Sequence, residues 1–196
     1  MTTKEITTEQ IKELRERTGI SIMQCKKALE EAEGDMEKAI ILLSKKSKQI
    51  AEKKSGRTLG SGIVQSYIHA GGSAGSMIEL LCETDFVAKN EDFKALAYDI
   101  AMQVTASAPQ FLKREDISDE ARAKATEVFE KEVQDKPEEM RGKILEGKLD
   151  AHFKDKVLLE QDFIKDPSKK ISTLVEEGTQ KFGEKIEIGK FTRFSI

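Results

Sequence analysis

A glycine-rich break between two kinds of hydrophobic periodicity limits what this sequence can fold into. Up to residue 54, apolar residues recur at the three- and four-residue spacing of amphipathic helices. Residues 55–62 contain three glycines and are typical of a linker. The segment Ile63–His69 that follows is rich in β-branched and aromatic residues, which favour a strand. We therefore expect an α+β protein with a helical domain at 1–54, a linker at 55–62 and a second domain at 63–196.

Three helix start signals, separated by two stop signals, precede the break. Thr7, Ser21 and Asp35 are suitable N-caps, and Gly19 and Gly34 are suitable stops. Three short helices are therefore predicted, with the charged run from Lys45 to Lys54 leading the chain out into solvent. A bundle this small buries little apolar surface by itself, so an apolar patch left for a partner protein is plausible. A generic three-helix cap is the alternative.

A small antiparallel sheet is expected after the linker. Ile63–His69 and Met77–Cys82 can pair as a hairpin, and Lys185–Phe194 supplies a third strand. Between the second and third strands, apolar residues from Phe93 to Val104 mark a helix that packs on this sheet.

The region before the last strand is highly charged. Ser118–Glu120 and Pro137–Glu139 are helix starts, so we predict an antiparallel helical hairpin at about 118–156 with solvated faces. Gln161–Phe163 is expected in a loop, and Asp166–Ser168 is expected to break the chain before a last helix.

Composition argues against several classes of function. The net charge of −3, from 33 basic and 36 acidic residues, disfavours direct nucleic-acid binding. No apolar run reaches the ~20 residues that span a membrane, and the amino terminus lacks the order of a secretory signal. The cytoplasm is the expected compartment.

Few residues suit catalysis or cofactor binding. Cys25 and Cys82 are too few for a disulfide framework or zinc site, and His69 and His152 are the only histidines. The glycines at 71–75 lack the basic residue of a phosphate loop and are typical of a turn between strands. We expect no metal, no cofactor and no covalent catalysis.

An acidic residue and a large aromatic stand side by side where the second strand ends. Asp85 and Phe86 lie between a buried strand and a helix that starts near Asn90, and connectors held at both ends often carry function. The alternative is structural: Phe86 packs into the core and Asp85 makes a turn hydrogen bond.

The longer strings around this pair resemble a known family. Glu79–Lys89 resembles the central signature of elongation factor Ts, and Leu14–Leu29 resembles that family's amino-terminal motif, at the expected distance upstream. The resemblance implies a guanine nucleotide exchange factor that binds elongation factor Tu·GDP and promotes GDP release, so that GTP can load. It acts by binding, without covalent chemistry.

The resemblance also implies roles for residues. The connector would be pushed between helices of the partner's G domain, where it disturbs the partner's magnesium. The implied exchange wedge is Thr84, Asp85, Phe86 and Val87. The helical domain would be a ubiquitin-associated-type bundle that docks on the partner. The implied partner contacts are Leu14, Arg15, Thr18, Gly19, Ile22, Met23, Lys26 and His69, although an exposed strand histidine can equally be incidental.

The chain resembles the short family members with a single core subdomain, which implies a homodimer; the sheet's exposed edge agrees with this. Two rival classes of function make different predictions. A protein-binding adaptor would hold its whole activity in the first fifty or so residues. A catalyst would turn over a small substrate by itself.

Overall fold

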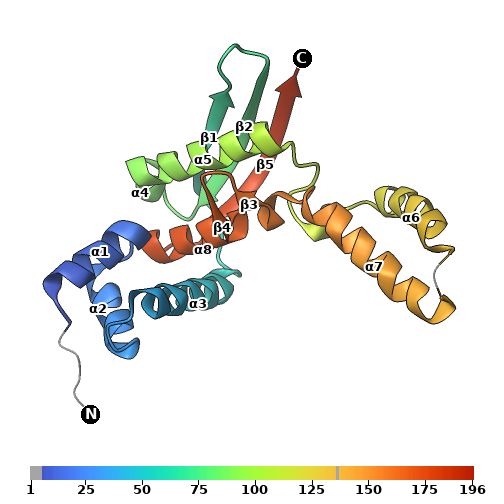
Figure 1. Cartoon of the computed structure of the whole chain (residues 1–196). Coiled ribbons are helices and arrows are strands. Elements are labelled where there is room, and N and C mark those ends of the chain that lie inside the picture. The colour runs from blue at the N-terminus through green and yellow to red at the C-terminus, as the bar shows by residue number, and fades with distance from the viewer. Residues whose placement is uncertain (1–5, 136) are drawn as a thin grey trace. The chain divides into compact units, whose positions relative to one another are not determined.

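The computed structural model describes residues 6–135 and 137–196 (Figure 1). Helices and a three-stranded antiparallel sheet combine in an α+β fold, which confirms the predicted fold class. The chain forms two compact units, and some helices and strands contribute to both. Among the described residues, the first unit contains 6–65 with 79–98 and 172–189, and the second contains 66–78, 99–135, 137–171 and 190–196.

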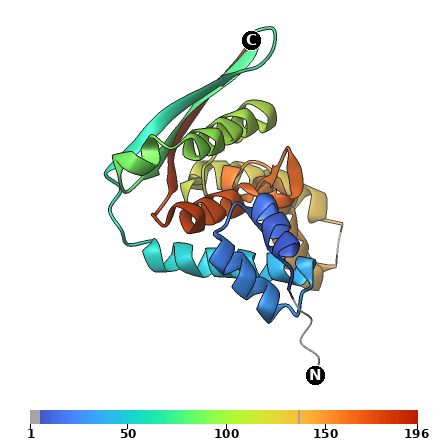
Figure 2. The same cartoon turned by 90° about the vertical axis from the view of Figure 1, so that its left-hand side faces the viewer.

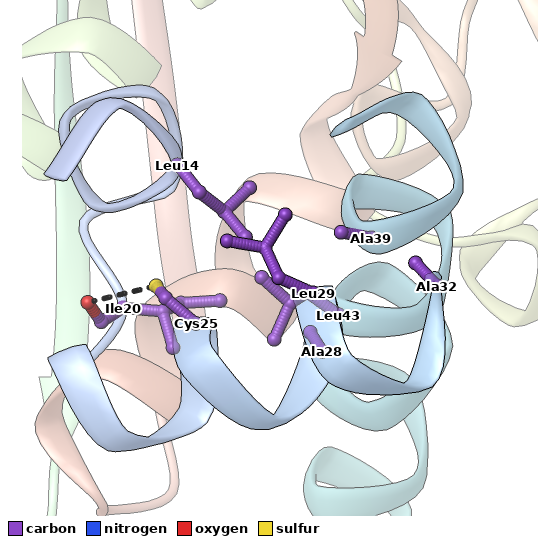
Figure 3. Close-up of a cluster of buried hydrophobic side chains, with 8 residues drawn as sticks. All are labelled: Leu14, Ile20, Cys25, Ala28, Leu29, Ala32, Ala39 and Leu43. Carbon is purple, nitrogen blue, oxygen red and sulfur yellow. Dashed lines mark hydrogen bonds between the residues drawn. The ribbon is translucent and has the colours of Figure 1, made fainter. Parts of the chain in front are cut away.

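The amino-terminal part of the first unit is the predicted set of three helices, α1 (Thr8–Thr18), α2 (Ile22–Glu31) and α3 (Met36–Lys54). Thr7 and Gln10 form a capping box at α1, and Gly19 ends that helix at φ 68°, a conformation that glycine adopts without strain. Figure 3 shows how the helices close on one apolar cluster. Its buried members are Leu14, Ile20, Cys25, Ala28, Leu29, Ala32, Ala39 and Leu43.

The carboxy-terminal half of α3 does not lead into solvent, so that prediction is wrong. Ser47 is fully buried and bonds to Gln180 of α8 (Ile171–Phe182), which runs beside α3 (Figures 1 and 2). The Gln180 amide also donates to Gln24 of α2, with 2.6 Å between nitrogen and oxygen. Buried polar contacts between helices therefore join the bundle to α8, and the hydrophobic periodicity does not reveal them.

The predicted sheet is present, with strand order β1 (Ser61–Ile68), β2 (Ala74–Cys82), β5 (Glu187–Ser195). After β2 come a single helical turn, α4 (Asp85–Ala88), and the long helix α5 (Glu91–Ser107). The predicted apolar face of α5 is buried at Phe93, Ala97, Ile100, Ala101 and Val104, and its remaining member, Leu96, is half-buried.

The second unit contains the two predicted hairpin helices, α6 (Asp119–Val133) and α7 (Glu138–Lys154). They follow a 3-10 turn, η1 (Arg114–Asp116), and enclose a small core. Its buried residues are Ile117, Ala125, Phe153 and Val157. No helix in the described parts of the chain is long and apolar enough to cross a membrane.

The sequence prediction missed a second, two-stranded sheet. After the 3-10 turn η2 (Leu158–Glu160), β3 (Asp162–Phe163) pairs antiparallel with β4 (Asp166–Lys170), where a loop and a chain break were expected. The cause is a buried glutamine: Gln103 donates to the carbonyl of Asp162 (3.2 Å) and accepts from the amide of Ile164 (2.9 Å). Side-chain bonds from α5 thus hold a ribbon too short to show a strand pattern.

Candidate partner-binding site

The Asp85-Phe86 pair lies on α4, a helix of one turn that follows directly from the central strand. Thr84 is its N-cap in extended conformation, and its hydroxyl accepts a long bond from the Val87 amide, 3.5 Å. Val87 and Ala88 are each 5% exposed, so the far side of the turn packs into the first unit. The turn is therefore anchored on one side and displays residues 85 and 86 on the other.

Phe86 is the most exposed phenylalanine of the described chain, with 81% of its surface accessible. This excludes the structural alternative in which the ring packs into the core. A phenylalanine left in water contributes almost nothing to folding, but its burial against a partner would contribute ~1.5–3 kcal/mol. The ring is thus available as an anchor for binding.

Asp85 is also exposed, and it is paired. Lys89 Nζ lies 2.7 Å from Asp85 Oδ2, one helical turn away. The hydrogen bond from this ammonium and its charge lower the pKa of Asp85, so the carboxylate is negative at neutral pH. The pair is solvent-exposed and weak, so a partner can compete for the carboxylate at little cost.

The bundle in the same unit presents a second exposed group. Ile22 and Met23, at the start of α2, are 52% and 70% exposed, and Lys26 follows one turn later. Large apolar side chains this exposed are typical of interaction surfaces when they gather on one helix face.

The other predicted bundle contacts take different positions. Arg15 and Gly19 are exposed and Thr18 is half-buried. Leu14 is fully buried, and its carbonyl accepts from the Thr18 hydroxyl at 2.7 Å. Leu14 and, in the turn, Val87 therefore support their neighbours from inside the fold.

His69 belongs to the second unit, unlike the other predicted site residues. It follows the end of β1, is exposed, and its Nδ1 lies 3.2 Å from the Tyr67 hydroxyl. Beside the two rings is a largely apolar cavity of about 310 Å³, whose floor includes Met102 and Ile164.

Three residues that sequence reasoning did not single out also shape the turn. Lys89 pairs with Asp85, and the carboxylates of Glu83 and Glu184 accept backbone hydrogen bonds next to it. A lysine four residues after an aspartate is a readable helix-pair signal. The Glu184 contact joins residues 100 positions apart and leaves no local pattern in the sequence.

The described residues show no arrangement suited to metal binding. In residues 6–135 and 137–196, no group of three or more His, Cys, Asp or Glu side chains is placed to hold an ion. Both cysteines are free and buried, and desolvation raises the pKa of each thiol, which makes them poor nucleophiles.

The fold and the candidate site define an α+β protein in which a helical bundle with exposed apolar side chains accompanies an anchored turn that displays a phenylalanine. Comparison with known proteins gives its family. The family model described as "Elongation factor TS" matches residues 3–196. Proteins named elongation factor Ts are 48% identical in Thermotoga maritima and 49% in Thermodesulfovibrio yellowstonii, over 98% and 97% of this chain and 96% of each relative. The Desulforamulus reducens protein of that name is 47% identical over 98% of this chain and 89% of its own length. The chain belongs to the elongation factor Ts family, a family of translation factors.

Proposed function

We propose that this protein binds elongation factor Tu·GDP and promotes GDP release, so that GTP can load. The exposure of Phe86 beside the ionised Asp85, on a turn anchored by buried Val87 and Ala88, carries the proposal. Because the backbone of the turn is held, less ordering of this segment is needed on binding. Family membership supports the choice of partner.

The mechanism requires no covalent chemistry. A factor that binds the empty form of its partner more tightly than the nucleotide-bound form weakens nucleotide binding by the same ratio. Phe86 acts as an apolar wedge between helices of the partner, and Asp85 brings a negative charge near the magnesium and phosphates. A coupling of ~4 kcal/mol would weaken GDP binding about a thousandfold.

The helical domain, residues 1–54, docks this wedge. Ile22, Met23 and Lys26 supply the exposed contacts, together with Arg15, Thr18 and Gly19, while Leu14 supports them from the core. His69 supplies a separate contact beside its apolar cavity. Residues 63–196, after the linker at 55–62, form the core and dimerisation domain.

A second copy of the chain is the proposed further partner. In the second unit, Ile68, Met77 and Phe194 are 70%, 46% and 69% exposed around a hollow of about 740 Å³ at the end of the sheet. β1 and β5 are the edges of this sheet, which favours self-association. Light scattering at micromolar concentration tests this, and a monodisperse monomer would contradict it. We propose a cytoplasmic protein with no direct contact to nucleic acid or membrane.

The test of exchange is the release of fluorescent GDP from purified elongation factor Tu. The double variant Asp85→Ala, Phe86→Ala is compared with a matched control, Glu127→Ala, Val128→Ala. The control pair is also an acidic residue followed by an exposed apolar one on a helix, and Glu127 pairs with Lys131 at 2.9 Å, as Asp85 does with Lys89.

Strong acceleration by the parent and the control, lost in a folded wedge variant, is the expected result. If the wedge variant is as active as the parent, Asp85 and Phe86 are not the wedge. If no form accelerates release but the isolated bundle binds the partner, the adaptor function takes precedence.

A further inference from the structure

One carboxylate, from the segment between α8 and β5, holds the start of the turn that carries the proposed wedge. Glu184 Oε2 accepts from the backbone amides of Glu83 (3.1 Å) and Thr84 (3.0 Å), and Oε1 accepts from the Thr84 hydroxyl at 2.7 Å. Hydrogen bonds to an ionised acceptor are about twice as strong as neutral ones. The backbone amides of Glu83 and Thr84, which follow the end of β2, are therefore hydrogen-bonded by the Glu184 side chain.

The contact is reciprocal. Glu83 Oε1 accepts from the backbone amide of Lys185 at 2.6 Å, and both its oxygens accept from Arg57 Nη1, at 3.1 and 3.2 Å. The Lys185 bond and then the Arg57 guanidinium lower the pKa of Glu83, so it remains an acceptor at neutral pH. We call the two pairs, Glu83-Thr84 and Glu184-Lys185, the carboxylate clasp.

The backbone before Glu184 positions its side chain. Gly183 follows the end of α8 at φ 71°, where a residue with a Cβ would be strained, and its amide bonds to the Thr179 carbonyl at 3.1 Å. Lys54 Nζ donates to the Gly183 carbonyl at 2.7 Å. The clasp therefore projects from a helix end that is itself held.

The clasp matters because α4 is too short to orient itself. It has four residues, and its capping bond from Val87 to Thr84 is long, at 3.5 Å. Phe86 receives no support from packing, so its direction follows the backbone alone. That backbone is held by burial after residue 86 and by the clasp before residue 85.

We propose that Glu184 is a positioning residue for nucleotide exchange, which orients the Asp85-Phe86 turn without touching the partner. This role rests on the proposed exchange function. Loss of the clasp leaves the wedge residues present but mobile. The maximal release rate at saturating factor then falls, while the concentration of factor at half-saturation, set mainly by the bundle, changes little.

Two substitutions separate the carboxylate's bonds from its charge. Glu184→Ala removes all three acceptor contacts. Glu184→Gln can keep three hydrogen bonds without the charge. Its carbonyl oxygen can accept from both amides, and its NH₂ group can donate to the Thr84 hydroxyl, which reverses the direction of that bond. Glu187→Ala is the matched control, since this neighbouring glutamate pairs with the Lys185 ammonium at 3.0 Å and not with the backbone amides of the turn.

Hydrogen exchange of the Glu83 and Thr84 amides in the free protein reports on the clasp alone. We expect amide exchange at least ~10-fold faster in Glu184→Ala, as two charge-assisted bonds are lost. Glu184→Gln should show a smaller increase, because its neutral oxygen keeps weaker bonds to both amides, and Glu187→Ala should show none. In the GDP-release assay we expect Glu184→Ala to lower the maximal rate ~10-fold and to change half-saturation less than ~3-fold. Thr84→Val keeps both amide bonds to Glu184 but removes the hydroxyl's bond to Glu184 and its long capping bond from Val87. It should show the same pattern more weakly if Glu184→Ala folds poorly.

Unchanged amide exchange in Glu184→Ala would overturn the clasp. A loss confined to half-saturation, or a Glu184→Gln variant as poor as Glu184→Ala, would overturn the positioning role. If the parent does not accelerate GDP release, the exchange function fails and the positioning role with it, whereas the amide data still decide whether the clasp exists.

Discussion

The same substitution, glycine to alanine inside a helix, should have opposite effects in α7 and α8. Gly147 lies in the interior of α7, and a Cβ added there would meet no atom within 4 Å. Alanine is better than glycine in a helix interior by ~1 kcal/mol, because less backbone entropy is lost on folding. With no steric cost, Gly147→Ala should stabilise the helical hairpin by nearly this full amount.

Gly178 in α8 is buried, and its added Cβ would lie 3.0 Å from Leu96 Cδ2 and 3.3 Å from Ile186 Cδ1. Ile186 is buried and Leu96 is half-buried, so these contacts can be relieved only in part without moving other side chains. Overpacking of this kind costs ~1–3 kcal/mol, which offsets or exceeds the gain in helix propensity. Gly178→Ala should therefore be neutral to ~2 kcal/mol destabilising.

Thermal unfolding and amide hydrogen exchange measure both effects. For a chain of this size, ~1 kcal/mol corresponds to a shift of about 2–4 °C in Tm, and to roughly fivefold slower exchange of α7 amides. Amide hydrogen exchange is the decisive measurement for Gly147→Ala, because it reports the opening of α7 separately from global unfolding. A Gly178→Ala protein stabilised as much as Gly147→Ala would refute the reasoning, since the sign rests on the close contacts alone.

Three further outcomes follow from burial and charge. Phe86→Ala should change the free energy of unfolding by less than ~0.5 kcal/mol in urea titrations, because the ring is exposed; a larger loss would mean that the ring packs in solution. Gln180→Leu should cost ~2 kcal/mol in the same titrations, because it removes the bonds that join α8 to α2 and α3, and a variant as stable as the parent would show that these bonds do not hold the bundle. Burial and then the charge of Lys156 lower the pKa of His152, so the unfolded chain takes up a proton more readily. The contribution of His152 to the free energy of unfolding is fully present above its unfolded pKa of 6.5 and decreases as the pH is lowered below that value. The urea midpoint should therefore decrease from pH 7 to 5.5 more in the parent than in His152→Gln.

Local signals in the sequence predicted most of the fold correctly. Thr7, Gly19 and Asp35 are caps and stops whose effect acts within a few residues, and the structure confirms them at the predicted helix ends. The α5 face and the strands of the main sheet were predicted from periodicity, which reports burial on one side of an element. These predictions succeed because the physical cause and the pattern lie in the same short segment.

The missed features are polar contacts between distant segments. Ser47 lies in a charged run typical of a surface, but it is buried and bonds to Gln180. Gln103 holds β3 through side-chain bonds to backbone groups of Asp162 and Ile164. The clasp partner of Thr84 is 100 residues away. Hydrophobic periodicity says nothing about which polar side chain meets which backbone amide, so such contacts require the tertiary structure.

The candidate site contains exposed residues and buried residues, and the two groups predict different effects of mutation. The exposed residues Met23 and Phe86 contribute little to folding, so their loss should affect binding or exchange and leave stability unchanged. Leu14 and Val87 are buried neighbours in the same motifs, so truncating them should lower stability together with activity. Glu184 belongs to neither group: its loss should loosen one turn and lower the maximal rate, with little change in global stability. Stability and kinetics measured on the same set of variants therefore separate residues that contact the partner from residues that hold them in place.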